Sequence, residues 1–141
     1  MPSAYLFAIL SAIFAAFTAI LAKIGIKDVN SNLATAIRTI VILLFAWGIV
    51  LFQGTYKQIG SISKLSMLFL VLSGIATGLS WLFYFKALQM GEASKIAPID
   101  KMSLVLTIIF AFIILGEKFT WMKIMGALLM TGGVLLISFS K

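Results

Sequence analysis

Apolar residues occur along this chain in five long continuous runs, separated by short polar stretches. The runs cover residues 4–22, 33–52, 65–88, 96–115 and 122–139. Each has about the 20 residues that a helix needs to cross the hydrocarbon core of a bilayer. Continuous runs favour helices over the short alternating strands of a membrane barrel. The pattern therefore predicts an all-α integral membrane protein, with five transmembrane helices in a single domain over residues 1–141.

The polar stretches between the runs are short and carry the residues that begin and end helices. The stretch Asp28–Asn32 offers capping side chains for the second helix. Before the fourth helix we expect Ser94 to be the cap and Pro98 to lie in the first turn, where its missing N–H matters least. This places Asp100 near the positive end of that helix dipole. Short connectors predict antiparallel neighbours.

Composition supports lipid as the solvent of this chain. Hydrophobic residues make up 62%, charged residues 11%, and the mean hydropathy is +1.18. So few polar groups could not cover the surface of a water-soluble domain. The first run opens without Lys or Arg, so we expect a membrane span rather than a cleaved signal peptide.

The net charge of +7 comes from single basic residues between the apolar runs. No clustered basic patch exists, so nucleic acid is not an expected partner. Five spans place one set of basic residues on the side of the C-terminus: Lys23, Lys27, Arg38, Lys86, Lys95, Lys101 and Lys141. The opposite side holds Lys57, Lys64, Lys118 and Lys123. Seven against four favours an outer N-terminus and an inner C-terminus, with a small bias.

Polar residues recur at helical spacing on several of the predicted helices. Ser73, Thr77, Ser80 and Tyr84 share one face of the third helix, with Trp81 at its margin. Such hydroxyls in membrane helices often bond to their own backbone or link helices. The functional alternative is that Ser73, Thr77, Trp81 and Tyr84 line a substrate path.

Ionisable residues inside a membrane are costly, so they are few and usually have a task. Arg38 lies about a turn and a half into the second run, where it either binds an anion or extends to the headgroups. Asp100 joins a polar stripe with Ser103 and Thr107. Adjacent helical residues point about 100° apart, so Asp100 and Lys101 need not pair. Asp100 and Glu117 are the acidic candidates for coupling or gating, although Glu117 can equally fix the geometry of a helix end.

Glycines recur at the spacing of helix contacts. Gly74 and Gly78 form a GxxxG in the third run, and Gly126 and Gly133 share a face of the fifth. Small residues let backbones approach closely in lipid. They serve either helix packing within one chain or a dimer face.

The chain lacks the residues of most catalytic and cofactor sites. It contains no cysteine and no histidine, which excludes disulfides, thiolate chemistry and Cys/His metal sites. No Ser/His/Asp set and no phosphate-binding glycine loop occurs. We therefore expect no enzyme, no metal and no cofactor. A small helical bundle with few buried charges suits a secondary transporter.

An ordered series of short motifs makes a more specific comparison possible. The pieces are Ala87–Leu88, Ala93–Ser94, "API" at 97–99, "LGE" at 115–117, Thr120, Gly126 and the closing "GGVLLI". Together with "LAKIGIK" and "AIRTIVILL" near the start, the series resembles the EamA-type pattern of the drug/metabolite transporter superfamily. The resemblance extends over essentially the whole chain.

The resemblance implies a fold and an assembly beyond the single chain. Family members commonly have ten spans, built as two inverted five-helix halves around a central path. This chain is similar to one half, from the five-span bacterial and archaeal branch in a prokaryotic inner membrane. It would then pair with a second copy, which is antiparallel if the dimer copies the inverted halves, or with another half-transporter. Small multidrug-resistance relatives couple to protons through a glutamate in the first helix. The first run here has no acid.

Three functional hypotheses follow. The first is an oligomeric, alternating-access transporter or exporter of a small organic metabolite or drug-like molecule. The second is a flippase-type transporter of a lipid-linked sugar or another amphiphile. The third is an accessory or scaffold subunit in the membrane without its own path.

Overall fold

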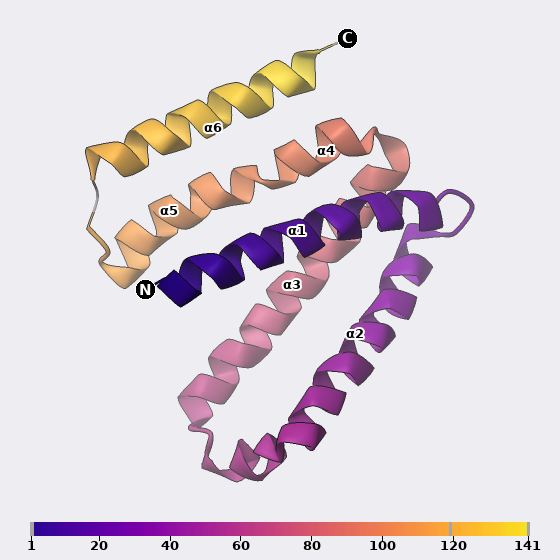
Figure 1. The fold of residues 1–141 in the computed structure, drawn as a ribbon, viewed down its shortest axis with the longest axis vertical. Coiled ribbons are helices and arrows are strands. Elements are labelled where there is room, and N and C mark those ends of the chain that lie inside the picture. Colours follow the sequence, from indigo (N-terminus) through magenta and orange to yellow (C-terminus); the bar gives the residue numbers. More distant parts are fainter. Residues whose placement is uncertain (1, 119, 141) are drawn as a thin grey trace. The chain divides into compact units, whose positions relative to one another are not determined.

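The computed structural model describes residues 2–118 and 120–140; Lys141, which entered the charge count above, lies outside the described residues. The elements are α-helices joined by short turns and one 3₁₀ helix, and no strand occurs in the part described (Figure 1). Their bounds are α1 Pro2–Gly25, α2 Ser31–Gln53, η1 Thr55–Ser61, α3 Lys64–Met90, α4 Ala93–Asp100, α5 Met102–Leu115 and α6 Trp121–Phe139.

Within residues 2–118 and 120–140, five helical stretches are long and apolar enough to cross a membrane. They cover Ser3–Gly25, Ser31–Gln53, Lys64–Met90, Ala93–Leu115 and Trp121–Phe139. This confirms the predicted fold class, an all-α membrane protein with five spans. The helices run up to three residues beyond the apolar runs because their polar end residues continue the backbone hydrogen bonds.

The helix ends follow local capping chemistry. The Asn30 side chain accepts from the backbone N–H of Asn32 at 2.9 Å and of Leu33 at 3.4 Å, which begins α2 as predicted. The hydroxyl of Thr120 accepts from Lys123 N–H and begins α6. Gly54 and Gly116 end α2 and α5 with φ of 69° and 64°, a conformation in which a side chain would be strained.

The fourth span departs from the sequence prediction in two ways. Ser94 is not its cap: α4 begins at Ala93 after Glu92, whose carbonyl accepts from Ile96 N–H at 2.9 Å. The helix thus begins earlier, and Pro98 lies inside it rather than in its first turn. Proline removes one helical hydrogen bond and crowds the carbonyl four residues earlier. The helix continues past Pro98 to Asp100 and is interrupted at Lys101, before α5 begins at Met102.

This break also moves Asp100. It is the last residue of α4, not a residue near the positive end of a helix that begins at Ser94. Its carboxylate lies 3.4 Å from Lys101 Nζ, at a surface where both side chains keep partial exposure. Adjacent residues pair here because the lysine is long and the helix turns at Lys101.

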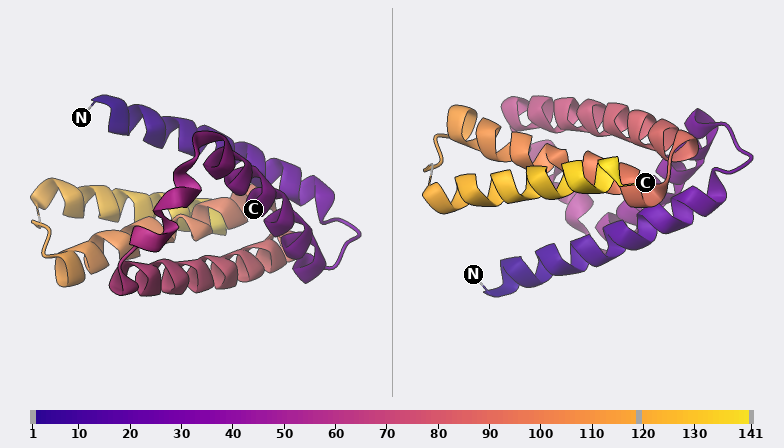
Figure 2. Two further views of the ribbon diagram at one scale, coloured as in Figure 1. Left: turned by 90° about the horizontal axis from the view of Figure 1, so that it is seen from below. Right: turned by 90° about the horizontal axis from the view of Figure 1, so that it is seen from above.

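The chain divides into two compact units. One comprises the chain up to Lys23 and from Met90 onward, and the other is Ile24–Gln89. In the first unit, α6 runs antiparallel to α4 and α5 and packs along both (Figures 1 and 2). Lys23 Nζ donates to the carbonyl of Gly91 at 2.6 Å, which ties the end of α1 to the turn before α4. In the second unit, α2 and α3 are antiparallel and are joined through η1 (Figure 1).

The α1–α2 turn is held to the end of α3 by one amide. Gln89 Nε2 donates to the carbonyl of Val29 at 2.8 Å and to that of Ile26 at 3.2 Å. Ile26 is buried, with 2% of its surface exposed. The Gln89 side chain therefore fixes where α2 begins relative to the end of α3.

Replacing Gln89 with leucine is expected to lower the free energy of unfolding by about 1–3 kcal/mol, because two shielded carbonyls lose their donor. Reversible unfolding in mixed detergent micelles measures this change. Gln58→Leu is the matched control, since that side chain is exposed in η1. Equal stability of the two variants would show that the amide does not hold the turn.

Candidate functional site

The candidate site lies in the second unit, where the beginning of α2 meets the end of α3. Ser31, Ala34 and Thr35 are the buried residues of α2, and Phe85 and Leu88 are those of α3. Phe85 is 1% exposed and Leu88 is 0% exposed. The packed part of this unit is therefore small and lies at one end of the two helices.

Arg38 is the charged member of this cluster. Its guanidinium carbon lies 4.2 Å from the centroid of the Phe85 ring, within the range of a cation–π interaction. The side chain is half-buried. It therefore lies against an aromatic ring of α3.

The guanidinium group has an unused donor. Nη1 of Arg38 is shielded from solvent and has no hydrogen-bond partner among the residues that the structure describes. A buried donor of this kind normally has a partner, and a charged one more so. The Phe85 ring offsets part of the desolvation penalty of the charge, but it supplies no oxygen or nitrogen that could accept a hydrogen bond from Nη1.

The two aromatic residues predicted for the path, Tyr84 and Trp81, lie on α3 close to Phe85. Tyr84 meets Phe85 edge to face, with centroids 5.6 Å apart and an interplanar angle of 72°. Trp81 is half-buried one turn earlier on α3. The structure thus brings Arg38 and Tyr84 to one cluster, with Trp81 at the adjacent turn.

The hydroxyl residues predicted for the path behave differently. Ser73 and Thr77 are exposed on α3, further from the packed end. The Thr77 hydroxyl donates to the Ser73 carbonyl at 2.9 Å, and Thr35 and Thr39 do the same within α2 at 2.8 Å. This is the backbone bonding that the sequence left open as the alternative to a path. A hydroxyl bonded in this way can still accept a hydrogen bond.

The acidic candidates do not join the cluster. Glu117 lies in the turn after α5, where its N–H donates to the Ala111 carbonyl at 3.2 Å past Gly116. Its carboxylate lies 3.3 Å from Lys123 Nζ, and both side chains are exposed. Glu117 therefore takes part in ending α5 and beginning α6. Its coupling role, like that of Asp100, stays a prediction.

The four predicted packing glycines face open space. A Cβ at Gly74, Gly78, Gly126 or Gly133 would meet no atom within 4 Å. Their outer faces are therefore accessible to another helix, and a contact with one stays a prediction. Among residues 2–118 and 120–140, no three acidic side chains gather as metal ligands would.

The sequence did not predict the role of Phe85 in the cluster, nor that of Gln89 at the neighbouring turn. Phe85 follows Trp81 by four residues and precedes Leu88 by three, which is one face of a helix. This spacing was the available signal. Large apolar residues occur around the whole circumference of α3, so the spacing did not show which face turns toward Arg38.

These features define a multi-pass α-helical membrane protein with a charged, aromatic-lined cluster between two of its spans. The chain belongs to the EamA-like transporter family, whose model matches residues 2–139. A protein of Sinorhizobium sp named "Uncharacterized transporter in cobO 3'region" is 47% identical over 131 residues, which cover 93% of each chain. No solved structure is significantly similar to the chain. The family and this relative identify the protein as a membrane transporter.

Proposed function

We propose that the protein is a secondary transporter that exports a small organic metabolite or drug-like molecule across a prokaryotic inner membrane. The observation that carries this proposal is Arg38, a charged side chain held against Phe85 inside an apolar helix. Charges at membrane depth commonly mark substrate pathways. The EamA-like family model, which matches residues 2–139, supports the assignment to the class of transporters.

The transport path forms at an oligomer interface, with two copies of the chain in place of two fused halves. Most of the large apolar side chains that the structure describes are exposed, and they occur on every span, which supports this proposal. The open faces of Gly74, Gly78, Gly126 and Gly133 are suited to close contact with a second chain. An antiparallel pair places each terminus on both sides of the membrane, whereas a parallel pair follows the charge bias, with the C-terminus inside.

A transporter of lipid-linked sugars or other amphiphiles is the second candidate. The apolar exposed helix faces favour it, since they tolerate acyl chains. Such a protein changes lipid asymmetry between leaflets without moving soluble solutes. An accessory subunit without a path is a further alternative, and it predicts a membrane partner that co-purifies with the chain.

Flux into proteoliposomes, measured with a metabolite panel, tests the proposal and the coupling residues together. Asp100→Asn and Glu117→Gln keep size and remove charge, so a coupled transporter is expected to lose accumulation against a gradient about tenfold or more. Lys118→Gln is the control at the α5–α6 turn. Wild-type flux in both acidic variants would remove the coupling role and leave facilitated transport.

A further inference from the structure

We propose that Arg38 binds the oxyanion group of the transported molecule, so that the substrate is a small organic anion with a carboxylate or phosphate. This inference rests on the proposed function and names the substrate class of its site. It follows from the charge balance of the chain and from the geometry of one guanidinium group.

The first step is that no acidic side chain in residues 2–118 and 120–140 forms an ion pair with Arg38. The chain has four acids. Three of them lie next to lysines: Glu92 at 3.5 Å from Lys95, Asp100 at 3.4 Å from Lys101 and Glu117 at 3.3 Å from Lys123. The fourth, Asp28, is exposed in the α1–α2 turn, and no ion pair joins it to Arg38 in the part of the chain described.

The second step is that the immediate neighbours of Arg38 on its own helix provide no strong acceptor. Ser31 and Thr35 lie seven and three residues earlier, on the same side of α2. The Thr35 hydroxyl donates to the Ser31 carbonyl, and the Thr39 hydroxyl donates to the Thr35 carbonyl. These bonds use the hydroxyl hydrogens of both threonines, and Nη1 of Arg38 has no partner among the described atoms.

The third step concerns orientation. The guanidinium carbon lies over the Phe85 ring, 4.2 Å from its centroid, so a ligand can reach only those N–H groups that do not face the ring. The guanidinium edge is a planar fork that matches two oxygens of a carboxylate or phosphate. Phe85 thus holds the Arg38 guanidinium in place for an oxyanion that binds the N–H groups pointing away from the ring.

The fourth step concerns the body of the ligand. Tyr84 contacts the Phe85 ring, and half-buried Trp81 lies one turn earlier on α3. An anion bound at the Arg38 edge would therefore have aromatic surface beside it. The site fits an organic acid with an apolar or aromatic body better than a bare inorganic ion. A lipid phosphate shares the same chemistry and is the competing source.

Arg38 is the single arginine of the chain, which makes a direct test possible. Protein labelled with guanidino-¹⁵N arginine in a neutral maltoside detergent gives one side-chain signal, which Arg38→Gln removes. The probes are 3-phenylpropionate, phenyl phosphate, the neutral 3-phenylpropionamide and short-chain phosphatidylglycerol. We expect the two organic anions to shift the signal and slow rotation of the group, and the amide to leave it unchanged.

Variants test affinity through ligand-observed NMR of the 3-phenylpropionate ring. Arg38→Gln is expected to weaken binding roughly ten- to hundredfold, because a charge-assisted hydrogen bond is lost. Arg38→Lys keeps the charge without the fork and should fall between. Lys86→Gln, an exposed cation on α3, should bind like wild type. Helical circular dichroism confirms that each variant is folded.

The outcomes separate this inference from the proposed function. A response to phosphatidylglycerol alone overturns the organic-anion assignment, and a response to no anion overturns the site. Flux of neutral metabolites that is unaffected by Arg38→Gln also overturns the inference while the transporter function stands. Anion binding at Arg38 without flux of any solute supports the site and contradicts the proposed transport.

Discussion

Replacing Phe85 with alanine is expected to lower the free energy of unfolding by about 2–4 kcal/mol, the largest change that any single apolar substitution in the second unit would cause. In soluble cores a buried Phe→Ala costs about 3–5 kcal/mol, partly through lost transfer from water. Lipid is as apolar as the protein interior, so much of that transfer contribution is absent here. The cavity and the cation–π contact remain.

The cation–π contribution can be isolated with leucine. Phe85→Leu keeps most of the volume but removes the ring from Arg38, which lies 4.2 Å from its centroid. A desolvated contact of this type is worth about 1–2 kcal/mol, so the leucine variant should lose about that amount. Reversible unfolding in mixed micelles measures all variants on one scale.

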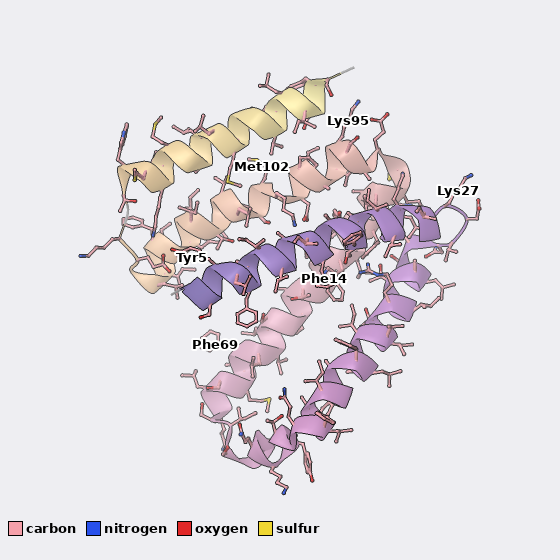
Figure 3. The ribbon with its side chains drawn as sticks, in the orientation of Figure 1. Tyr5, Phe14, Lys27, Phe69, Lys95 and Met102 are labelled. Atoms are coloured by element: carbon pink, nitrogen blue, oxygen red, sulfur yellow. The ribbon has the colours of Figure 1, made fainter. Side chains whose placement is uncertain are left out.

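Phe83→Ala is the matched control, because Phe83 lies two residues away on the same helix and is 73% exposed. Outward aromatic residues on α3 are drawn in Figure 3, where the ring of Phe69 stands out from the helix. We expect the control to change stability by less than about 0.5 kcal/mol. Similar losses at residues 83 and 85 would show that Phe85 has no special packing role.

The second large effect concerns orientation in the membrane. For an antiparallel pair, fusions of alkaline phosphatase and of green fluorescent protein after the last residue should both be active in comparable amounts. The near balance of seven against four basic residues is compatible with insertion in both directions. A signal from one fusion alone would contradict an inverted homodimer.

Single lysines should move this balance in opposite directions. Lys27 lies in the loop between α1 and α2, with its side chain pointing outward (Figure 3). Lys57 lies in η1, beyond the other end of α2. Lys27→Gln should raise the phosphatase signal, and Lys57→Gln should raise the fluorescence. Each variant serves as the control of the other, since both side chains are exposed. Equal ratios in both variants would show that loop charge does not set the orientation.

The architecture could be predicted from the sequence because lipid imposes a simple length requirement. Five runs of about 20 apolar residues correspond to five long helices. The break in the fourth span was missed, since the effect of Pro98 depends on where the helix begins. Ser94 was expected to begin it, but the Glu92 carbonyl accepts the first helical bonds. The helix therefore begins two residues earlier than expected, and Pro98 lies in its interior instead of in its first turn.

The candidate site was predicted only in part, for a different physical reason. Arg38 stood out because a charge in an apolar helix is rare. Its aromatic neighbour could not be predicted, because aromatic and aliphatic residues occur around the whole circumference of α3 and the rotation of the helix about its own axis is set by packing. Phe85 therefore emerged only from the structure, as did Gln89, whose two acceptors come from residues about 60 positions earlier.

The transport function is tested most directly by measuring solute flux through the purified chain by itself in proteoliposomes. We expect saturable uptake or counterflow of at least one small organic metabolite, which is absent from liposomes without protein. For an anionic substrate, Arg38→Gln should reduce this flux about tenfold or more. Liposomes that contain the folded protein but move no solute, and show only lipid scrambling or no activity, would contradict this function.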